Sequence, residues 1–357
     1  MKQGPEPRPA GVTNFETPAL RAARNTLSGG TRRRIRVAYG KKEKVLEAPD
    51  ELLKKVSIIV CTVARFKELE RCLHSLEPFQ AGGAEVIVVN NGQHHAEVQG
   101  IADRHAARVV DEPRRGLGAA RNCGIRMGCR PLLVFLDDDA WAMPEWLLHL
   151  VQPFEDPDVL AVAGSALTDS PSDPVSGLFE QFYRAHCPAT RMSLPAPKAT
   201  CPFPLRAAMC GLGLNMAFRR VALERFGLFD ARFGRGTRIG SGEETERFLA
   251  VMLGGGKVII EPAAVVLHSF PTDARAYHRA IFQAGCAHTA ILTKYFLQEP
   301  SLRGQILRYA ASRLRPRSAP EASTAAKLKV PRIPFLLGSL FGPMALFLAR
   351  NKEAKTR

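Results

Sequence analysis

The sequence lacks the features that mark secreted, zinc-finger or membrane-spanning proteins. Its eight cysteines include no C-x-x-C pair and form no recognisable disulfide framework, so we expect free, mostly buried thiols in a reducing compartment. No apolar stretch follows the first charged residues, and no run of about 18 apolar residues occurs. The sequence therefore predicts a cytoplasmic protein with neither a signal peptide nor a clear transmembrane helix.

Acidic residues are scarce at both ends of the chain. The formal net charge is +16, of which residues 1–55 carry +7 and residues 271–357 carry +11, while residues 56–270 carry −2. Aromatic residues make up only 7% of the chain and are not interleaved with the basic ones, which argues against a nucleic-acid-binding protein. Basic ends on a nearly neutral middle suit a catalytic domain held against an anionic membrane surface, and solvated tails are the alternative.

The sequence contains enough apolar residues, 46% of the 357, to form a large packed domain. Short β-branched runs alternate with helical spacings from residue 56 onward. Strands are predicted over 56–62, 85–89, 108–110 and 132–136, with helices over 66–77, 94–106 and 117–128. This alternation predicts an α/β fold with a mostly parallel sheet and helices on both faces.

Further along the chain the pattern is less regular. We expect a helix over 141–154, strands over 159–163, 211–219 and 258–260, and helices over 220–226 and 243–253. Residues 168–210 show little periodicity and read as a functional or disordered loop. The apolar stretch 334–349 is interrupted by Gly338, Gly342 and Pro343, and it predicts either a helix lying in a membrane interface or one docked on the main domain. Three regions result: a basic, flexible extension over 1–54, a catalytic domain over 55–270 and a basic helical region over 271–357.

Three consecutive carboxylates, Asp137, Asp138 and Asp139, follow directly on the apolar run 132–136. In open parallel sheets, ligands bind at the carboxyl ends of the strands. Adjacent carboxylates repel one another, and a divalent cation such as Mg²⁺ or Mn²⁺ would offset this while bridging to a diphosphate. The alternative is an acidic loop that caps the next helix.

A second acidic segment opens the helix predicted over 243–253 and contains Glu243 and Glu244. The helix dipole favours acidic residues there in any protein, but a carboxylate at this place could also act as a general base toward an acceptor hydroxyl. His268 follows the strand-like run 263–267 and could supply a nitrogen ligand to the same cation. A structural or exposed histidine is the alternative.

The order of the motifs is more informative than any one of them. The motifs are Ser57–Thr62, Glu85–Gly92, Arg115–Gly124, Asp137–Asp139, Gly211–Arg219, Phe229-Asp230, Gly242–Glu246 and Val266–His268. Together they resemble the family 2 glycosyltransferases, inverting enzymes with the GT-A fold, over about residues 56–270. The resemblance implies transfer of a sugar from a nucleotide sugar, UDP- or dTDP-linked, to a hydroxyl group, in the biosynthesis of cell-surface glycan or polysaccharide.

Several residues take expected roles from this resemblance. The residues implied to bind the nucleotide sugar are Thr62, Arg65, Asn90, Arg121, Asp137 and Asp138. Asp139 and His268 would hold Mn²⁺ or Mg²⁺. Glu244 falls where the family has its catalytic aspartate, and Glu243 is the substitute base. The partners implied are the donor and a glycan or lipid-linked acceptor.

Two departures from the family pattern leave alternatives open. Asn90 stands where the family usually has an aspartate that contacts the base, which puts the base preference in doubt. Glu244 is one methylene longer than the usual aspartate. The second hypothesis is therefore a catalytically silent nucleotide-sugar-binding protein. A nucleotidyltransferase could also use a strand-end aspartate cluster, but the segment 62–67 does not resemble its phosphate-binding loop.

Overall fold

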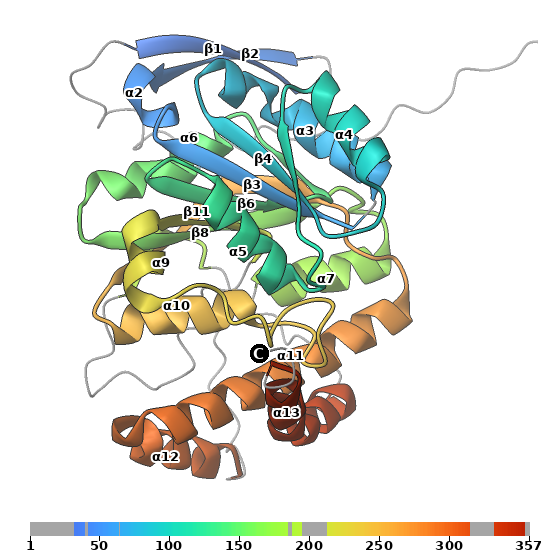
Figure 1. Ribbon diagram of the computed structural model, residues 1–357, viewed down its shortest axis with the longest axis vertical. Coiled ribbons are helices and arrows are strands. Elements are labelled where there is room, and N and C mark those ends of the chain that lie inside the picture. Colours follow the sequence, from blue (N-terminus) through green and yellow to red (C-terminus); the bar gives the residue numbers. More distant parts are fainter. Residues whose placement is uncertain are drawn as a thin grey trace, which may run out of the picture. The chain divides into compact units, whose positions relative to one another are not determined.

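The structure is a computed structural model of the 357-residue chain (Figure 1). It describes residues 32–39, 42–63, 65–184, 188–194, 213–314 and 332–353. Residues 1–31, the larger part of the extension predicted to be flexible, lie outside the described residues. Where the sequence predicted no strand, β1 (Arg32–Tyr39) pairs antiparallel with β2 (Lys42–Pro49), and the short helix α2 (Asp50–Leu53) follows.

The main sheet has nine strands among the described residues, in the order β5-β4-β3-β6-β10-β8-β11-β7, with β9 paired to β11. The strands are β3 (Val56–Thr62), β4 (Glu85–Asn90), β5 (Arg108–Asp111), β6 (Leu132–Asp137), β7 (Ala140–Ala142), β8 (Val159–Thr168), β9 (Met192–Leu194), β10 (Asn215–Arg219) and β11 (Lys257–His268). Strands β3, β4, β5, β6, β8 and β11 run in one direction, and β7, β9 and β10 run against them. The predicted mostly parallel sheet is therefore confirmed.

Helices cover both faces of this sheet, as predicted. They are α3 (Phe66–Ala81), α4 (His95–Arg104), α5 (Leu117–Met127), α6 (Trp146–Val151), α7 (Pro174–Arg184), α9 (Arg220–Phe226) and α10 (Glu243–Leu253). Alternate residues of a strand point to opposite faces. Ile58 and Val60 accordingly pack in one core with Leu69 and Leu73 of α3, while Ile59 packs in the other with Ala120 of α5.

The helix predicted over 141–154 is wrong in its first third. Residues 140–142 form β7, in which Trp141 lies opposite Leu267 of β11. The chain then forms α6 and the 3₁₀ turn η1 (Gln152–Glu155), which has a proline in its first turn. A three-residue strand that pairs with a distant strand leaves no periodicity for the sequence to reveal. The region 168–210 likewise contains regular structure that was not predicted, namely α7 and β9.

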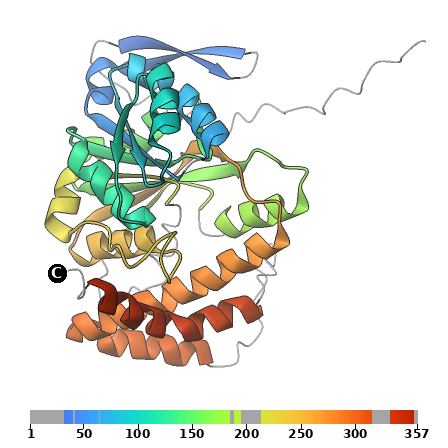
Figure 2. The same ribbon diagram turned by 45° about the vertical axis from the view of Figure 1, so that its right-hand side comes forward.

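The C-terminal region is helical, as predicted. It contains α11 (Ala274–Gln298), the short 3₁₀ turn η2 (Pro300–Leu302), α12 (Arg303–Leu314) and α13 (Arg332–Glu353), and Figure 2 shows α13 lying along α11. The carboxylate of Asp273 caps α11 by accepting from the Arg275 backbone N–H at 2.9 Å. Within α13, the window Arg332–Ala349 has a mean hydropathy of 1.6 and is long and apolar enough to cross a membrane, which the sequence analysis did not expect.

Candidate active site

The carboxyl ends of the strands that run in the common direction gather the polar residues singled out in the sequence. Strand β3 ends at Thr62, β4 at Asn90, β6 at Asp137 and β11 at His268. Thr62 and Asn90 lie directly opposite each other on adjacent strands. This edge is where ligands bind in open α/β sheets.

Asp138 is the buried anchor of the aspartate triplet. Its carboxylate accepts a hydrogen bond from the Thr62 hydroxyl at 2.7 Å and is fully buried. The Arg65 guanidinium donates to both Asp138 and Asp139. Burial raises the pKa of Asp138, although Arg65 and Thr62 oppose the rise. The structure thus brings Thr62, Arg65 and the triplet into one cluster.

Asp137, Asp139 and His268 form a group whose ligand atoms all lie within 4.8 Å of one another. His268 Nε2 lies 3.0 Å from Asp139 Oδ1 without forming a hydrogen bond to it. In the described part of the chain, Asp139 Oδ1 and His268 Nδ1 are buried atoms without a hydrogen-bond partner. Burial lowers the pKa of His268 to about 4, so the imidazole is neutral at pH 7. Two carboxylates beside a neutral imidazole are a fitting ligand set for a small divalent cation.

Arg121 joins the triplet to the second acidic segment. Its guanidinium lies 3.2 Å from Asp137 Oδ1, donates to Glu243 Oε1 at 2.6 Å and donates to the Gly213 carbonyl at 2.6 Å. Arg121 is 1% exposed. Burial opposes the charged form, but Glu243 and Asp137 outweigh it and hold the pKa of Arg121 above its usual value. One buried cation therefore sets the spacing between β6 and the start of α10.

Glu244 stands beside this bridge at the first turn of α10. Its side chain is partly buried, and a Cβ added to Gly213 would lie 3.2 Å from Glu244 Cγ and from both terminal nitrogens of Arg121. Burial, with a contribution from the negative charge of Glu243, raises the pKa of Glu244 to about 8. The helix begins after Gly242, which has a φ of 89°, a backbone conformation that favours glycine. A Cβ added at this position would lie only 2.7 Å from the Ala287 Cβ, so a larger residue does not fit.

Asn90 is held by a carboxylate that the sequence analysis did not single out. Asn90 Nδ2 donates to Asp111 Oδ1 at 2.8 Å, and His95 Nδ1 lies 2.8 Å from Asp111 Oδ2. The hydrogen bond from His95 and that from Asn90 lower the pKa of Asp111. Asp111 ends β5, next to β4. An anionic carboxylate is therefore present at this end of the sheet, one strand over from the position that Asn90 occupies.

Two further residues near the cluster were also missed. Arg235 lies close enough to Asp137 and His268 to lower the pKa of both. Tyr183 of α7 stacks on Phe270 with a centroid distance of 5.2 Å, and burial raises its pKa to about 12. The arginine-rich segment 232–238 was a signal that could have indicated Arg235. Tyr183 falls in a region that showed no periodicity, so no signal indicated it.

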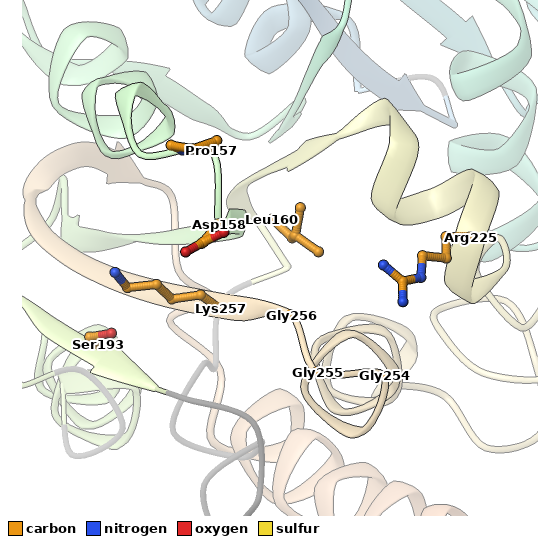
Figure 3. Close-up of a pocket in the computed structure, with 9 residues that line it drawn as sticks. All are labelled: Pro157, Asp158, Leu160, Ser193, Arg225, Gly254, Gly255, Gly256 and Lys257. Atoms are coloured by element: carbon orange, nitrogen blue, oxygen red, sulfur yellow. The ribbon is translucent and has the colours of Figure 1, made fainter.

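A separate hollow lies at the other end of two of these strands (Figure 3). It is lined by Pro157, Asp158, Leu160, Ser193, Arg225, Gly254, Gly255, Gly256 and Lys257. Lys257 begins β11, whereas His268 ends it, so this hollow is not part of the aspartate cluster. The Lys257 ammonium donates to Asp156 Oδ2 at 2.6 Å, which ties the starts of β8 and β11 together.

Comparison with known proteins identifies the family of the central region. Residues 57–227 match the family model described as Glycosyl transferase family 2. The chain is 29% identical over 137 residues to the glucosyl-dolichyl phosphate glucuronosyltransferase of Haloferax volcanii, a match that covers 36% of this chain and 44% of that protein. It is 26% identical over 237 residues to the pre-mycofactocin glycosyltransferase of Mycobacterium tuberculosis, covering 65% and 46% respectively. The chain thus spans less than half the length of these curated relatives.

Among solved structures, the glucosyl-3-phosphoglycerate synthase of Mycobacterium tuberculosis, in complex with Mn²⁺, UDP and glucosyl-3-phosphoglycerate, matches with a TM-score of 0.45 and 16% identity. That match covers 70% of this chain and 86% of the synthase. The family match over residues 57–227 confirms, for that region of the chain, the resemblance that the order of the motifs indicated.

Proposed function

Because residues 57–227 are a family 2 glycosyltransferase domain, we propose that this protein transfers a sugar from a UDP- or dTDP-sugar to an acceptor hydroxyl, with inversion of the anomeric configuration. The observation that carries this proposal is the buried bridge of Arg121. It ties Asp137, on the side expected to bind the donor, to Glu243, the neighbour of the expected base Glu244. A direct displacement requires the donor and the base to be held at a fixed spacing, and this bridge fixes the spacing between Asp137 and the first turn of α10.

In this reaction Glu244 takes the proton of the acceptor hydroxyl. The acceptor oxygen forms a bond to the anomeric carbon while the bond from that carbon to the diphosphate oxygen breaks, and the nucleoside diphosphate leaves. Burial keeps the pKa of Glu244 near 8, so its ionised form is a stronger base than an ordinary carboxylate. A single base suffices because no covalent enzyme intermediate forms. Glu243 is less available to an acceptor hydroxyl, because its carboxylate already accepts a hydrogen bond from Arg121 at 2.6 Å.

The remaining residues hold the donor. Asp139 and His268, with Asp137 beside them, would hold Mn²⁺ or Mg²⁺, which when bound offsets the charge of the leaving diphosphate. Thr62 and Arg65 position Asp138, and Arg65 is 36% exposed, so it can also reach a phosphate. Asp111 supplies the carboxylate that Asn90 lacks, because Asn90 fixes its orientation.

For the acceptor, we propose a glycan or lipid-linked hydroxyl at the cytoplasmic face of a membrane, in the biosynthesis of a cell-surface glycan or polysaccharide. Support comes from the relative of Haloferax volcanii, whose name contains glucosyl-dolichyl phosphate, a lipid-linked sugar. The charge of +11 over residues 271–357 also supports an anionic surface as partner.

The test is binding and hydrolysis of a panel of nucleotide sugars with Mn²⁺, with Mg²⁺ and with chelator, for the wild type and for Asp139→Ala. We expect one donor to be used, only with metal, and the variant to lose that use while staying folded. Donor binding without hydrolysis or transfer would favour the catalytically silent protein. A folded wild type that binds no donor would overturn the proposal.

A further inference from the structure

The outer face of α13 carries a continuous stripe of large apolar side chains. They are 49–79% exposed and comprise Ile333, Leu336, Leu337, Leu340, Met344 and Phe347. Their spacing of three and four residues places them on one side of the helix. No described part of the chain covers this side. Scattered single apolar residues are normal on a surface, but a stripe about 20 Å long marks an interaction site.

The opposite side of α13 is fixed to α11 by close helix packing. A Cβ added to Gly338 would lie 1.9 Å from the Phe282 carbonyl oxygen, and one added to Gly342 would lie 2.1 Å from the Thr289 hydroxyl. The Thr289 hydroxyl donates to the Ser339 carbonyl at 2.8 Å. Gly338 and Gly342 therefore form the contact surface between α13 and α11, which lie along each other in Figure 2, and the apolar stripe on the other side of α13 stays exposed.

Charge indicates what covers the stripe. In the sequence, residues 313–332 before it carry six Lys/Arg and one Glu, and residues 350–357 after it carry four Lys/Arg and one Glu. A second copy of the chain would bring one basic segment against another, whether the two α13 helices paired parallel or antiparallel. An anionic lipid surface would instead attract both segments. We infer that the stripe of α13 docks on an anionic bilayer.

The geometry also fixes how α13 meets the bilayer. A helix that crossed the membrane would carry α11 with it, because the glycine contacts join them, and α11 bears the charged residues Arg275, Arg279 and Lys294. Charged side chains are costly in the hydrocarbon core. The helix therefore lies in the plane of the interface, with the stripe among the acyl chains and the α11 side toward water.

This docking would place the catalytic site at the membrane surface, a consequence that rests on the proposed function. Lys294 of α11 lies 2.9 Å from Glu246 of α10, and Ala287 of α11 packs against Gly242. Helix α11 thus connects the bilayer-docked α13 to the helix that begins with Glu243 and Glu244.

The test is flotation of the full chain with vesicles of phosphatidylcholine, with and without phosphatidylglycerol. The variant Leu336→Glu/Leu340→Glu changes the stripe. Its matched control is Val221→Glu, a comparably exposed (51%) apolar side chain on α9. We expect the wild type and the control to bind the anionic vesicles, and the double variant to partition more than about tenfold more weakly. Wild type that does not bind, or a double variant that binds as wild type does, would overturn the inference.

Two measurements distinguish interfacial docking from the alternatives, which are a second copy of the chain on the stripe and an α13 that spans the membrane. Sedimentation without lipid should show the same mass for the wild type and the double variant, and a dimer lost only in the variant would show that a second copy covers the stripe. Quenching of Leu340→Trp by brominated lipids should be strongest for bromines near the headgroup. Strongest quenching by bromines at the chain ends would show a spanning helix. Donor hydrolysis by the double variant should equal that of the wild type, so a failure of docking stays distinguishable from a failure of the proposed reaction.

Discussion

The replacement Glu244→Gln tests the proposed base most directly. Glutamine keeps the length and shape of the side chain but cannot accept the proton of the acceptor hydroxyl. Removing a general base typically lowers kcat by about 10²–10⁴. Donor binding should change little, because the expected donor contacts come from β3, β4 and the aspartate triplet.

The pH dependence supplies a second, independent quantity. The pKa of Glu244 is about 8 in the folded chain, against an ordinary 4.5. The folded state therefore binds this proton more tightly than the unfolded state, so the free energy of unfolding falls as pH rises from about 4.5 to 8 and is flat above. Each unit of pKa shift changes the free energy of unfolding by at most about 1.4 kcal/mol. Because solvent screens this partly exposed side chain, we expect a total decline of about 1–3 kcal/mol. Glu244→Gln should abolish that decline.

The assays are initial rates over a pH series and urea unfolding at pH 5 and pH 8. In the wild type, kcat/KM should rise with pH up to about 8, as Glu244 ionises. Glu244→Gln should lose this rise of kcat/KM with pH, and at pH 8 its free energy of unfolding should be higher than that of the wild type. The matched control is Glu243→Gln, which removes a carboxylate already paired with Arg121. Wild-type kcat in Glu244→Gln, with a loss in Glu243→Gln, would refute the assignment of the base.

Three other outcomes follow from contacts in the structure. Arg121→Met should lower the free energy of unfolding by about 3–5 kcal/mol at pH 7, because Asp137 and Glu243 would lose their buried cation, and by less at acid pH. Urea denaturation measures this change, and a loss below about 1 kcal/mol would contradict the prediction. Asp111→Asn should weaken binding of the preferred donor in calorimetry about tenfold or more, and unchanged affinity would exclude Asp111 from the donor site. Gly338→Leu should speed hydrogen exchange in α13 and leave that of the sheet unchanged, because the new side chain cannot fit against α11.

Local patterns were enough to predict most of the α/β core. Buried strands such as β3 and β6 are short, mainly apolar runs, and α3 repeats its apolar residues at helical spacing, so each can be recognised without its neighbours. The aspartate triplet could be placed at a strand end for the same reason. The motif order then sufficed to identify the family that the match over residues 57–227 confirms.

Contacts between distant segments were beyond the reach of such patterns. Strand β7 exists because it pairs with β11, and Asp111 lies beside Asn90 because β5 and β4 are adjacent, neither of which leaves a periodic signal. The same holds for Arg121, which the resemblance implied to bind the nucleotide sugar and which contacts Glu243 as well as Asp137.

For the C-terminal helix α13, too, the sequence determines some properties and the tertiary structure determines others. The sequence by itself determined that residues 334–349 are apolar, interrupted by glycine and flanked by basic residues, because these are properties of composition. Only the tertiary structure decided which side of α13 is buried, since that depends on the backbone of α11 lying against Gly338 and Gly342. An apolar helix can be buried, spanning or interfacial, and the packing partner on one side determines what remains for the other.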